Sequence, residues 1–161
     1  RDLITLGLDP VTELPQYQSG SGVKARGLEL SADKTWHWGG RLRGSLSLQD
    51  VRDAEGVTLA NAPQRLGKLN FSTPLPAAGL RIGYELQYDS QRRTLDGSHL
   101  GGYALSNLHL TASRWVPGLE LSLGVRNLFD KRHAHPGADS NWQAALAQDG
   151  RSLRLEARYR F

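Results

Sequence analysis

The strictest pattern in the chain is an alternation of apolar and polar residues from Arg151 to Phe161. Leu153, Leu155 and every second residue after them are apolar or aromatic, whereas Arg and Glu fill the positions between. A β-strand has a side-chain period of two, so the two sets lie on opposite faces of a sheet. Taken alone, this segment fits either an edge strand of a soluble antiparallel sheet or a strand between lipid and a wet interior.

The same alternation returns along most of the sequence. It is clearest at 41–48, 80–89 and 119–126, and weaker copies lie at 4–8, 27–32, 68–71 and 108–112. Together with the last segment these make about eight strands, most of them near the ~9 to 11 residues that a tilted strand needs to cross a bilayer.

The segments between these strands alternate in length. Long polar segments cover 9–22, 49–65, 90–102 and 130–150, and short ones cover 34–40, 73–79 and 114–118. Transmembrane barrels have short periplasmic turns and long extracellular loops, whereas a soluble sandwich has no reason to keep this order. The sequence therefore predicts an all-β fold, an antiparallel transmembrane β-barrel whose last strand ends at the periplasmic rim and whose long loops are extracellular.

Composition agrees with a membrane barrel. Only 39% of the 161 residues are hydrophobic, which suffices because every second strand residue faces the polar lumen. No run of about 18 apolar residues exists, which excludes a transmembrane helix. The chain has no cysteine, so disulfides, thiolate chemistry and cysteine-based zinc sites are excluded. The net charge of +4 is scattered over alternate strand positions and loops, which favours a lumen or rim location over nucleic-acid binding.

One segment near the C-terminus resembles a known family. Val-Arg-Asn-Leu-Phe-Asp-Lys-Arg at 125–132 is followed by a loop containing Gly and Pro, then by Gly-Arg at 150–151 and a strand ending Tyr-Arg-Phe at 159–161. This order is similar to the C-terminus of TonB-dependent outer-membrane receptors, and segments 17–30 and 61–63 fit the same barrel. The signature residues are Asn127, Leu128, Phe129, Asp130, Gly150, Arg151, Tyr159 and Phe161.

The resemblance implies that residues 1–161 are one domain, the C-terminal portion of a barrel of about 22 strands around a plug. The plug and the N-terminal strands would then be missing, so TonB would act only through regions outside this chain. A start at Arg1, with neither Met nor a signal segment, predicts a processed, truncated or partial product.

The resemblance also implies a function and a location, namely a Gram-negative outer-membrane receptor and transporter for active uptake of a scarce ligand. Ferric siderophores, haem and cobalamin are the implied substrates. The implied partners are outer-membrane lipid and, through the terminal strand with Phe161, the barrel-assembly machinery. The alternative is a small free-standing eight-stranded barrel with a structural or interaction role, its interior filled by side chains. Gly, Ser and Arg at the inward positions favour part of a wide barrel.

Candidate ligand residues are few. His133 and His135 lie two apart in a long loop that continues to Asp139, and His99 lies near Asp96 in another. Imidazoles could bind a transition metal or haem iron, but we favour solvated loop histidines and assign no metal site, cofactor or cofactor-binding residue.

No catalytic arrangement is visible either. The sequence has no Gly-x-Ser-x-Gly motif, and His109 near Ser106 and Ser122 is the faint exception. The chain is therefore not expected to be an enzyme. Trp36, Trp38 and Trp115 flank short turns and predict an interfacial aromatic girdle.

Overall fold

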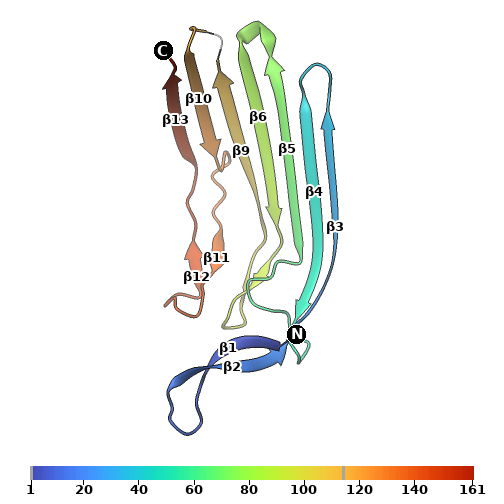
Figure 1. The fold of residues 1–161 in the computed structure, drawn as a ribbon, viewed down its shortest axis with the longest axis vertical. Coiled ribbons are helices and arrows are strands. Elements are labelled where there is room, and N and C mark those ends of the chain that lie inside the picture. Colours follow the sequence, from blue (N-terminus) through green and yellow to red (C-terminus); the bar gives the residue numbers. More distant parts are fainter. Residues whose placement is uncertain (1, 114) are drawn as a thin grey trace.

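The computed structural model describes residues 2–113 and 115–161, most of which form one antiparallel sheet of seven long strands (Figure 1). In sheet order these are β13 (Ser152–Tyr159), β10 (Leu119–Arg126), β9 (Tyr103–Ala112), β6 (Leu80–Asp89), β5 (Arg65–Leu75), β4 (Arg41–Arg52) and β3 (Lys24–Thr35). Each strand pairs with its neighbours in the chain's order. The outer strands β3 and β13 do not pair with each other, so the sheet is open.

The two ends of the sheet differ. One end carries tight turns, including the 3-10 turn η1 (Pro76–Ala78). The opposite end, at the bottom of Figure 1, carries three small hairpins. They are β1 (Asp2–Leu8) with β2 (Pro15–Gly22), β7 (Arg92–Arg93) with β8 (His99–Leu100), and β11 (Ala134–Pro136) with β12 (Ala145–Ala147). The predicted alternation of short turns and long connections is therefore present.

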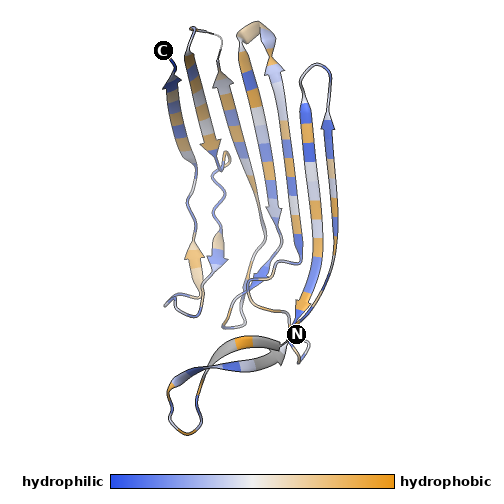
Figure 2. Ribbon diagram, in the orientation of Figure 1, coloured by the Kyte–Doolittle hydropathy of each residue, from blue (hydrophilic) through white to orange (hydrophobic). Residues whose placement is uncertain are grey.

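The strand register gives the sheet one apolar and one polar face. A single row of laterally paired residues crosses six strands as Leu42, Phe71, Tyr84, Leu108, Val125 and Leu153. A row on the other face reads Asp33, Arg43, Asn70, Glu85 and Asn107. Figure 2 shows the result as alternating orange and blue bands along the strands.

The apolar face has no protein layer over it. Leu153 and Leu155 are 73% and 77% exposed, and Tyr103 and Ala112 are the buried hydrophobic residues among those described. A soluble antiparallel sheet packs one face on a protein core. The extended apolar surface without a core therefore fits contact with lipid.

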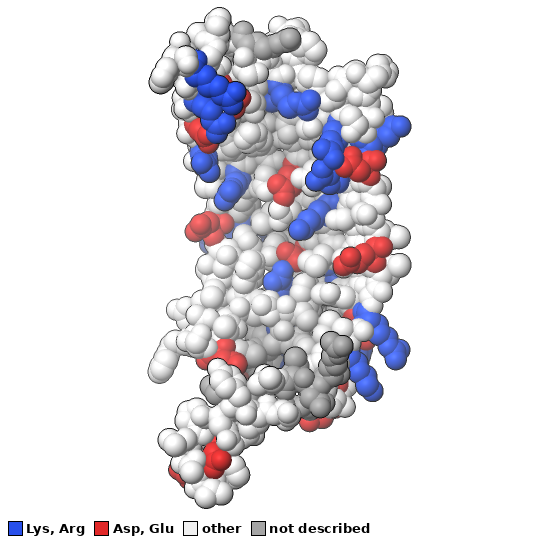
Figure 3. All heavy atoms as spheres, viewed as in Figure 1, with Lys and Arg blue, Asp and Glu red and all other residues white. Residues whose placement is uncertain are grey.

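The polar face carries charges of both signs, which Figure 3 shows scattered across the sheet. Arg41 and Arg43 share the carboxylate of Asp33, at 2.5 and 3.2 Å. Arg154 and Arg158 share Glu156 in the same way, at 3.3 and 3.2 Å. These ion pairs join side chains of the same or neighbouring strands, so they need no opposite wall close by.

Two details differ from the prediction. The segment at 4–8 lies outside the main sheet, because it pairs with β2, part of the expected long loop 9–22. Alternation does not distinguish a barrel strand from an arm of a loop hairpin. Most long strands also extend beyond the predicted segments, as β3 and β5 do at both ends, because the alternation fades where strands carry Gly, Lys and Arg.

The predicted turn 114–118 begins at Arg114, which lies outside the described residues. No helix among the described residues is long and apolar enough to cross a membrane.

The two faces predict opposite responses to a buried charge. Leu121 lies on the apolar face. Its neighbour Ser122 lies on the polar face, where it lines a shallow hollow together with Arg43 and Glu85. Leu121→Arg should lower the free energy of unfolding of the full-length protein in lipid vesicles by about 2 to 4 kcal/mol if the residue lies near the bilayer midplane. Ser122→Arg should cost much less. Equal losses, measured by denaturant titration, would mean that both faces contact the same medium.

Candidate functional site

The short-turn end of the sheet is rich in tryptophan. Trp36 and Trp38 stack in the β3–β4 turn, with ring centroids 5.5 Å apart. Trp115 lies in the β9–β10 turn and donates its indole N–H to the carbonyl of Ala78 at 2.8 Å. The structure therefore places these rings at the short-turn end, and an interfacial aromatic girdle there stays a prediction.

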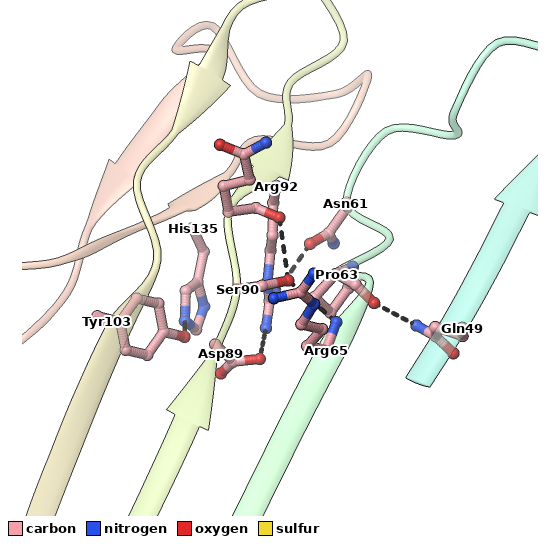
Figure 4. Close-up of polar contacts among 10 residues, drawn as sticks. Gln49, Asn61, Pro63, Arg65, Asp89, Ser90, Arg92, Tyr103 and His135 are labelled. Atoms are coloured by element: carbon pink, nitrogen blue, oxygen red, sulfur yellow. Dashed lines mark hydrogen bonds and ion pairs between the residues drawn. The ribbon is translucent and has the colours of Figure 1, made fainter. Parts of the chain in front are cut away.

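At the opposite end, hydrogen bonds join the roots of neighbouring long loops (Figure 4). Gln49 Nε2 donates to the carbonyl of Pro63 at 2.7 Å. The backbone N–H of Arg65 donates to Ser90 Oγ at 3.0 Å, and the backbone N–H of Ser90 donates to the carbonyl of Arg65 at 3.0 Å. The β4–β5 and β6–β9 connections are therefore fixed to each other where they leave the sheet.

Arg92 is the central cation of this network. Its Nη2 contacts Asp89 at 2.8 Å and its Nη1 donates to Asn61 Oδ1 at 3.0 Å. The side chains of Arg92 and Asp89 are only 17% and 15% exposed, and Arg92 Nε has no acceptor in the described protein. A buried charge is costly to leave unpaired. Asp89 supplies the opposite charge, and the contacts with Asp89 and Asn61 together hold the guanidinium in one position.

A tyrosine and two histidines connect the third long loop to the same region. The hydroxyl of Tyr103 lies 2.8 Å from Nε2 of His135, and the Tyr103 ring centroid lies 4.5 Å from that of His133. Tyr103 is 6% exposed. Burial, followed by the nearby positive charge of Arg92 and by His133, lowers the pKa of His135 below its ordinary value. The shift favours the neutral imidazole, which can accept a hydrogen bond from the Tyr103 hydroxyl in the tautomer that leaves Nε2 unprotonated.

The family signature forms a clasp between β10 and β13. Asn127 has a φ of 49°, a left-handed conformation that asparagine tolerates. Its buried side-chain amide forms hydrogen bonds with the backbone on both sides of the turn. Oδ1 accepts from the N–H of Lys131 at 2.8 Å, and Nδ2 donates to the carbonyls of Lys131 and Asp149 at 3.0 and 3.4 Å.

Asp130 completes the clasp. Its Oδ1 accepts from the N–H of Arg151 at 2.8 Å, where β13 is about to begin. A Cβ on Gly150 would lie 2.6 Å from that oxygen, so any larger residue there would displace the Asp130 carboxylate. Leu128 donates its N–H to the carbonyl of Ser106 on β9 at 2.7 Å, whereas the Phe129 side chain is 74% exposed. These contacts give Asn127, Asp130 and Gly150 a structural explanation.

The predicted site residues separate in space. His133 and His135 lie together around Tyr103, with ring centroids 5.7 Å apart. Asp139 is exposed in the turn after β11, and His99 is exposed in β8, where it pairs with Arg93. No group of three or more His, Cys, Asp or Glu suited to a metal occurs among the described residues.

At the other end of the sheet, Tyr159 and Phe161 are exposed, with ring centroids 6.4 Å apart. The arrangement with His109, Ser106 and Ser122 does not assemble. Ser106 contacts Tyr84 at 2.8 Å on the apolar face, whereas His109 and Ser122 are on the polar face.

Sequence reasoning missed Asn61, Asp89, Arg92 and Tyr103. Opposite charges three residues apart at the end of a strand, as at Asp89 and Arg92, were a usable signal. Tyr103 gave none, because its partner His135 is 32 residues away.

These features define a sector of a transmembrane β-barrel wall, with a fixed polar cluster at its loop end. Residues 1–128 match the family model described as TonB dependent receptor-like, beta-barrel. The chain therefore belongs to this family of bacterial outer-membrane receptors and transporters, which are not enzymes.

Solved structures share the fold. The pyoverdine outer membrane receptor FpvA from Pseudomonas aeruginosa PAO1 aligns with a TM-score of 0.78 and 20% identity over 100% of this chain and 25% of its own. BauA, the ferric preacinetobactin receptor from Acinetobacter baumannii, gives 0.76 and 18% over 98% and 26%. The FrpB iron transporter from Neisseria meningitidis gives 0.73 and 19% over 99% and 27%. The chain thus spans about a quarter of these receptors. No curated protein matches its sequence significantly.

The clasp predicts a local loss of stability when Asn127 is changed. Asn127→Ala removes the three side-chain hydrogen bonds and disfavours the left-handed conformation, so it should destabilise the β10–β13 connection by about 1 to 3 kcal/mol. Asn127→Gly keeps the backbone conformation accessible, so it separates the two contributions. Hydrogen exchange at 127–131 and 149–152 in the full-length receptor measures the effect. Unchanged protection in both variants would contradict the clasp.

The lowered pKa of His135 predicts weaker loop packing in acid. Because its folded-state pKa lies below the unfolded value, the stabilisation is complete above the ordinary pKa of about 6.5 and is lost as pH falls through the folded-state value. Hydrogen exchange at 99–104 and 134–136, corrected for intrinsic rates, should be faster at pH 5 than at pH 7.5. His135→Gln should remove this difference. A difference that persists in His135→Gln would assign the effect to another group.

Proposed function

We propose that the intact protein is an outer-membrane receptor that takes up a ferric siderophore through the TonB system. Residues 1–161 would supply part of its barrel wall and of its extracellular loops. Haem and cobalamin are the other ligand classes to test. The proposal is supported by the family match and by structural neighbours described as a pyoverdine receptor and a ferric preacinetobactin receptor.

The observation that carries the proposal is the cluster of Tyr103, His135, Arg92 and Asp89 at the loop end. Asp89 and Tyr103 are paired residues on the polar face, so the cluster lies where that face meets the long loops. An aromatic ring and polar groups held by hydrogen bonds are suited to fixing the orientation of a ligand. The roots of three long loops meet there, which would give a ligand a rigid first contact.

The alternative of a free-standing eight-stranded barrel has no support from the sheet. Such a barrel must close by pairing its first strand with its last, whereas β3 and β13 pair with each other nowhere. A role of the terminal strand in recognition by the barrel-assembly machinery stays a proposal, as do contacts of the apolar face with lipid.

Uptake by the full-length receptor tests the function. We expect a receptor-deficient Gram-negative host to accumulate ⁵⁵Fe from ferripyoverdine or ferric preacinetobactin when it expresses the receptor, and to stop when tonB is deleted. Haem and cyanocobalamin serve as the other arms. Uptake of none of the four above the empty-vector level would overturn the proposal.

The loop cluster should contribute to affinity. Tyr103→Phe keeps the ring and removes the hydroxyl that holds His135, so we expect about a fivefold or larger rise in half-saturating ligand concentration. Tyr159→Phe, at the opposite end of the sheet, is the matched control and should leave uptake unchanged. Identical uptake curves for both variants would exclude the cluster from the site.

A further inference from the structure

A second polar site lies on the apolar face, at its loop-side edge. Leu69 pairs with Leu86 on this face, and one step toward the loops Gly67 pairs with Tyr88. One step further, Arg65 and Ser90 are joined by their backbone hydrogen bond. Side chains two residues apart on a strand share a face. Arg65 is therefore on the same outward face as Leu69, where the apolar band ends.

Arg65 and Lys131 line one hollow of about 660 Å³, together with Gln64, Tyr88, Ser90 and Gln91. Neighbouring groups hold both cationic residues by their backbones. Ser90 binds the backbone of Arg65 on both its N–H and its carbonyl, and the Asn127 clasp binds the N–H and carbonyl of Lys131. Two residues with long cationic side chains therefore line the hollow, and hydrogen bonds fix the backbone of each.

The charge of this hollow is not neutralised. No acidic residue lines it, and among the described residues neither Arg65 nor Lys131 forms an ion pair. On the polar face, Arg41, Arg43 and Arg154 have carboxylate partners, whereas Lys68, Arg81 and Arg126 form no ion pair among the described residues. The described part of the chain therefore supplies no anionic partner for these two exposed cationic residues.

The position of the hollow identifies the chemistry of that anion. Tyr88 lines the hollow and is 43% exposed. It lies next to the leucines of the apolar band, and an amphipathic ring there favours a membrane interface. Arg26 and Lys24 lie on the same face of β3, two and four residues beyond Leu28, which pairs with Leu48. Arg26 is opposite Asp50 and Lys24 is opposite Arg52, so this part of the edge carries three cationic residues and one carboxylate. A ligand for this edge carries negative charge directly above hydrocarbon, which describes an acidic lipid headgroup rather than a free anion.

We propose that Arg65 and Lys131 bind the phosphate of a phosphorylated glycolipid, the headgroup class of the outer leaflet of the outer membrane. This proposal rests on the proposed extracellular location of the long loops. The lipid's acyl chains lie along the apolar face at Leu69 and Leu86, its phosphate lies between the two cations, and Tyr88 packs at the boundary. Tyr103 also lines this hollow, so the lipid site adjoins the Tyr103 and His135 cluster, although Tyr88 and Tyr103 are on opposite faces of the sheet.

Binding of defined lipids to the full-length receptor tests the proposal. The receptor is placed in phosphatidylcholine nanodiscs that contain diphosphorylated lipid A or its fully dephosphorylated form, and bound lipid is measured after exchange into lipid-free detergent. We expect retention of the phosphorylated form only. Arg65→Gln and Lys131→Gln should each weaken it about fivefold, and the double variant roughly 25-fold. Lys131→Arg keeps the charge and should retain the lipid. Lys68→Gln, on the polar face of the same strand as Arg65, is the control.

Several outcomes would overturn the lipid site. The first is equal retention of phosphorylated and dephosphorylated lipid A, and the second is unchanged retention by the double variant. The third is a loss of retention in Lys68→Gln as large as in Lys131→Gln. The fourth is displacement of lipid A by millimolar inorganic phosphate, which would indicate a free-phosphate site. Iron uptake separates this proposal from the proposed function. A receptor that transports ferripyoverdine but does not retain lipid A refutes only the lipid site, and one that retains lipid A but transports none of the tested ligands refutes only the transport role.

Discussion

Inter-strand backbone hydrogen bonding is the constraint on which the rest of this structure depends. In hydrocarbon every peptide N–H and C=O needs an internal partner, and strands achieve this only by pairing with neighbours on both sides. The five inner strands of the main sheet do so in sequence order, and the outer strands β3 and β13 each pair on one side. The period of two then separates Leu42 and Phe71 from Arg43 and Asn70, so one backbone arrangement produces both an apolar and a polar surface.

The same constraint explains why the two ends of the sheet differ. At the tight turns the chain reverses within a few residues. Gly118 permits the reversal before β10, because its φ is 77° and a Cβ there would lie 2.4 Å from the carbonyl oxygen of Arg160. At the loop end the chain leaves the sheet for longer excursions. Buried side-chain contacts, such as Arg92 with Asp89 and Tyr103 with His135, replace the strand ladder there. Binding chemistry can develop at that end without disturbing the wall.

The long strands and the order of loop lengths could be predicted because local alternation encodes them. The ends of β5 and β9 could not, since residues such as Gly67 and Tyr103 carry no periodic signal. The Asn127 motif was recognisable as a family signature, but its role as a clasp depends on Lys131, Asp149 and β9 together. The paired histidines were visible in the sequence, whereas Tyr103 was not, because the contact joins the start of β9 to β11 in a later loop, and only the folded sheet brings them together.

The central claim is that the long loops and the tight turns lie on opposite sides of one membrane. Single cysteines at Ala138, in the exposed turn after β11, and at Ala78, in the short turn η1, test it in whole cells expressing the full-length receptor. A membrane-impermeant maleimide should label the cysteine at 138 at once, and the cysteine at 78 only after the outer membrane is opened. Labelling at 78 but not at 138 in intact cells would contradict the account.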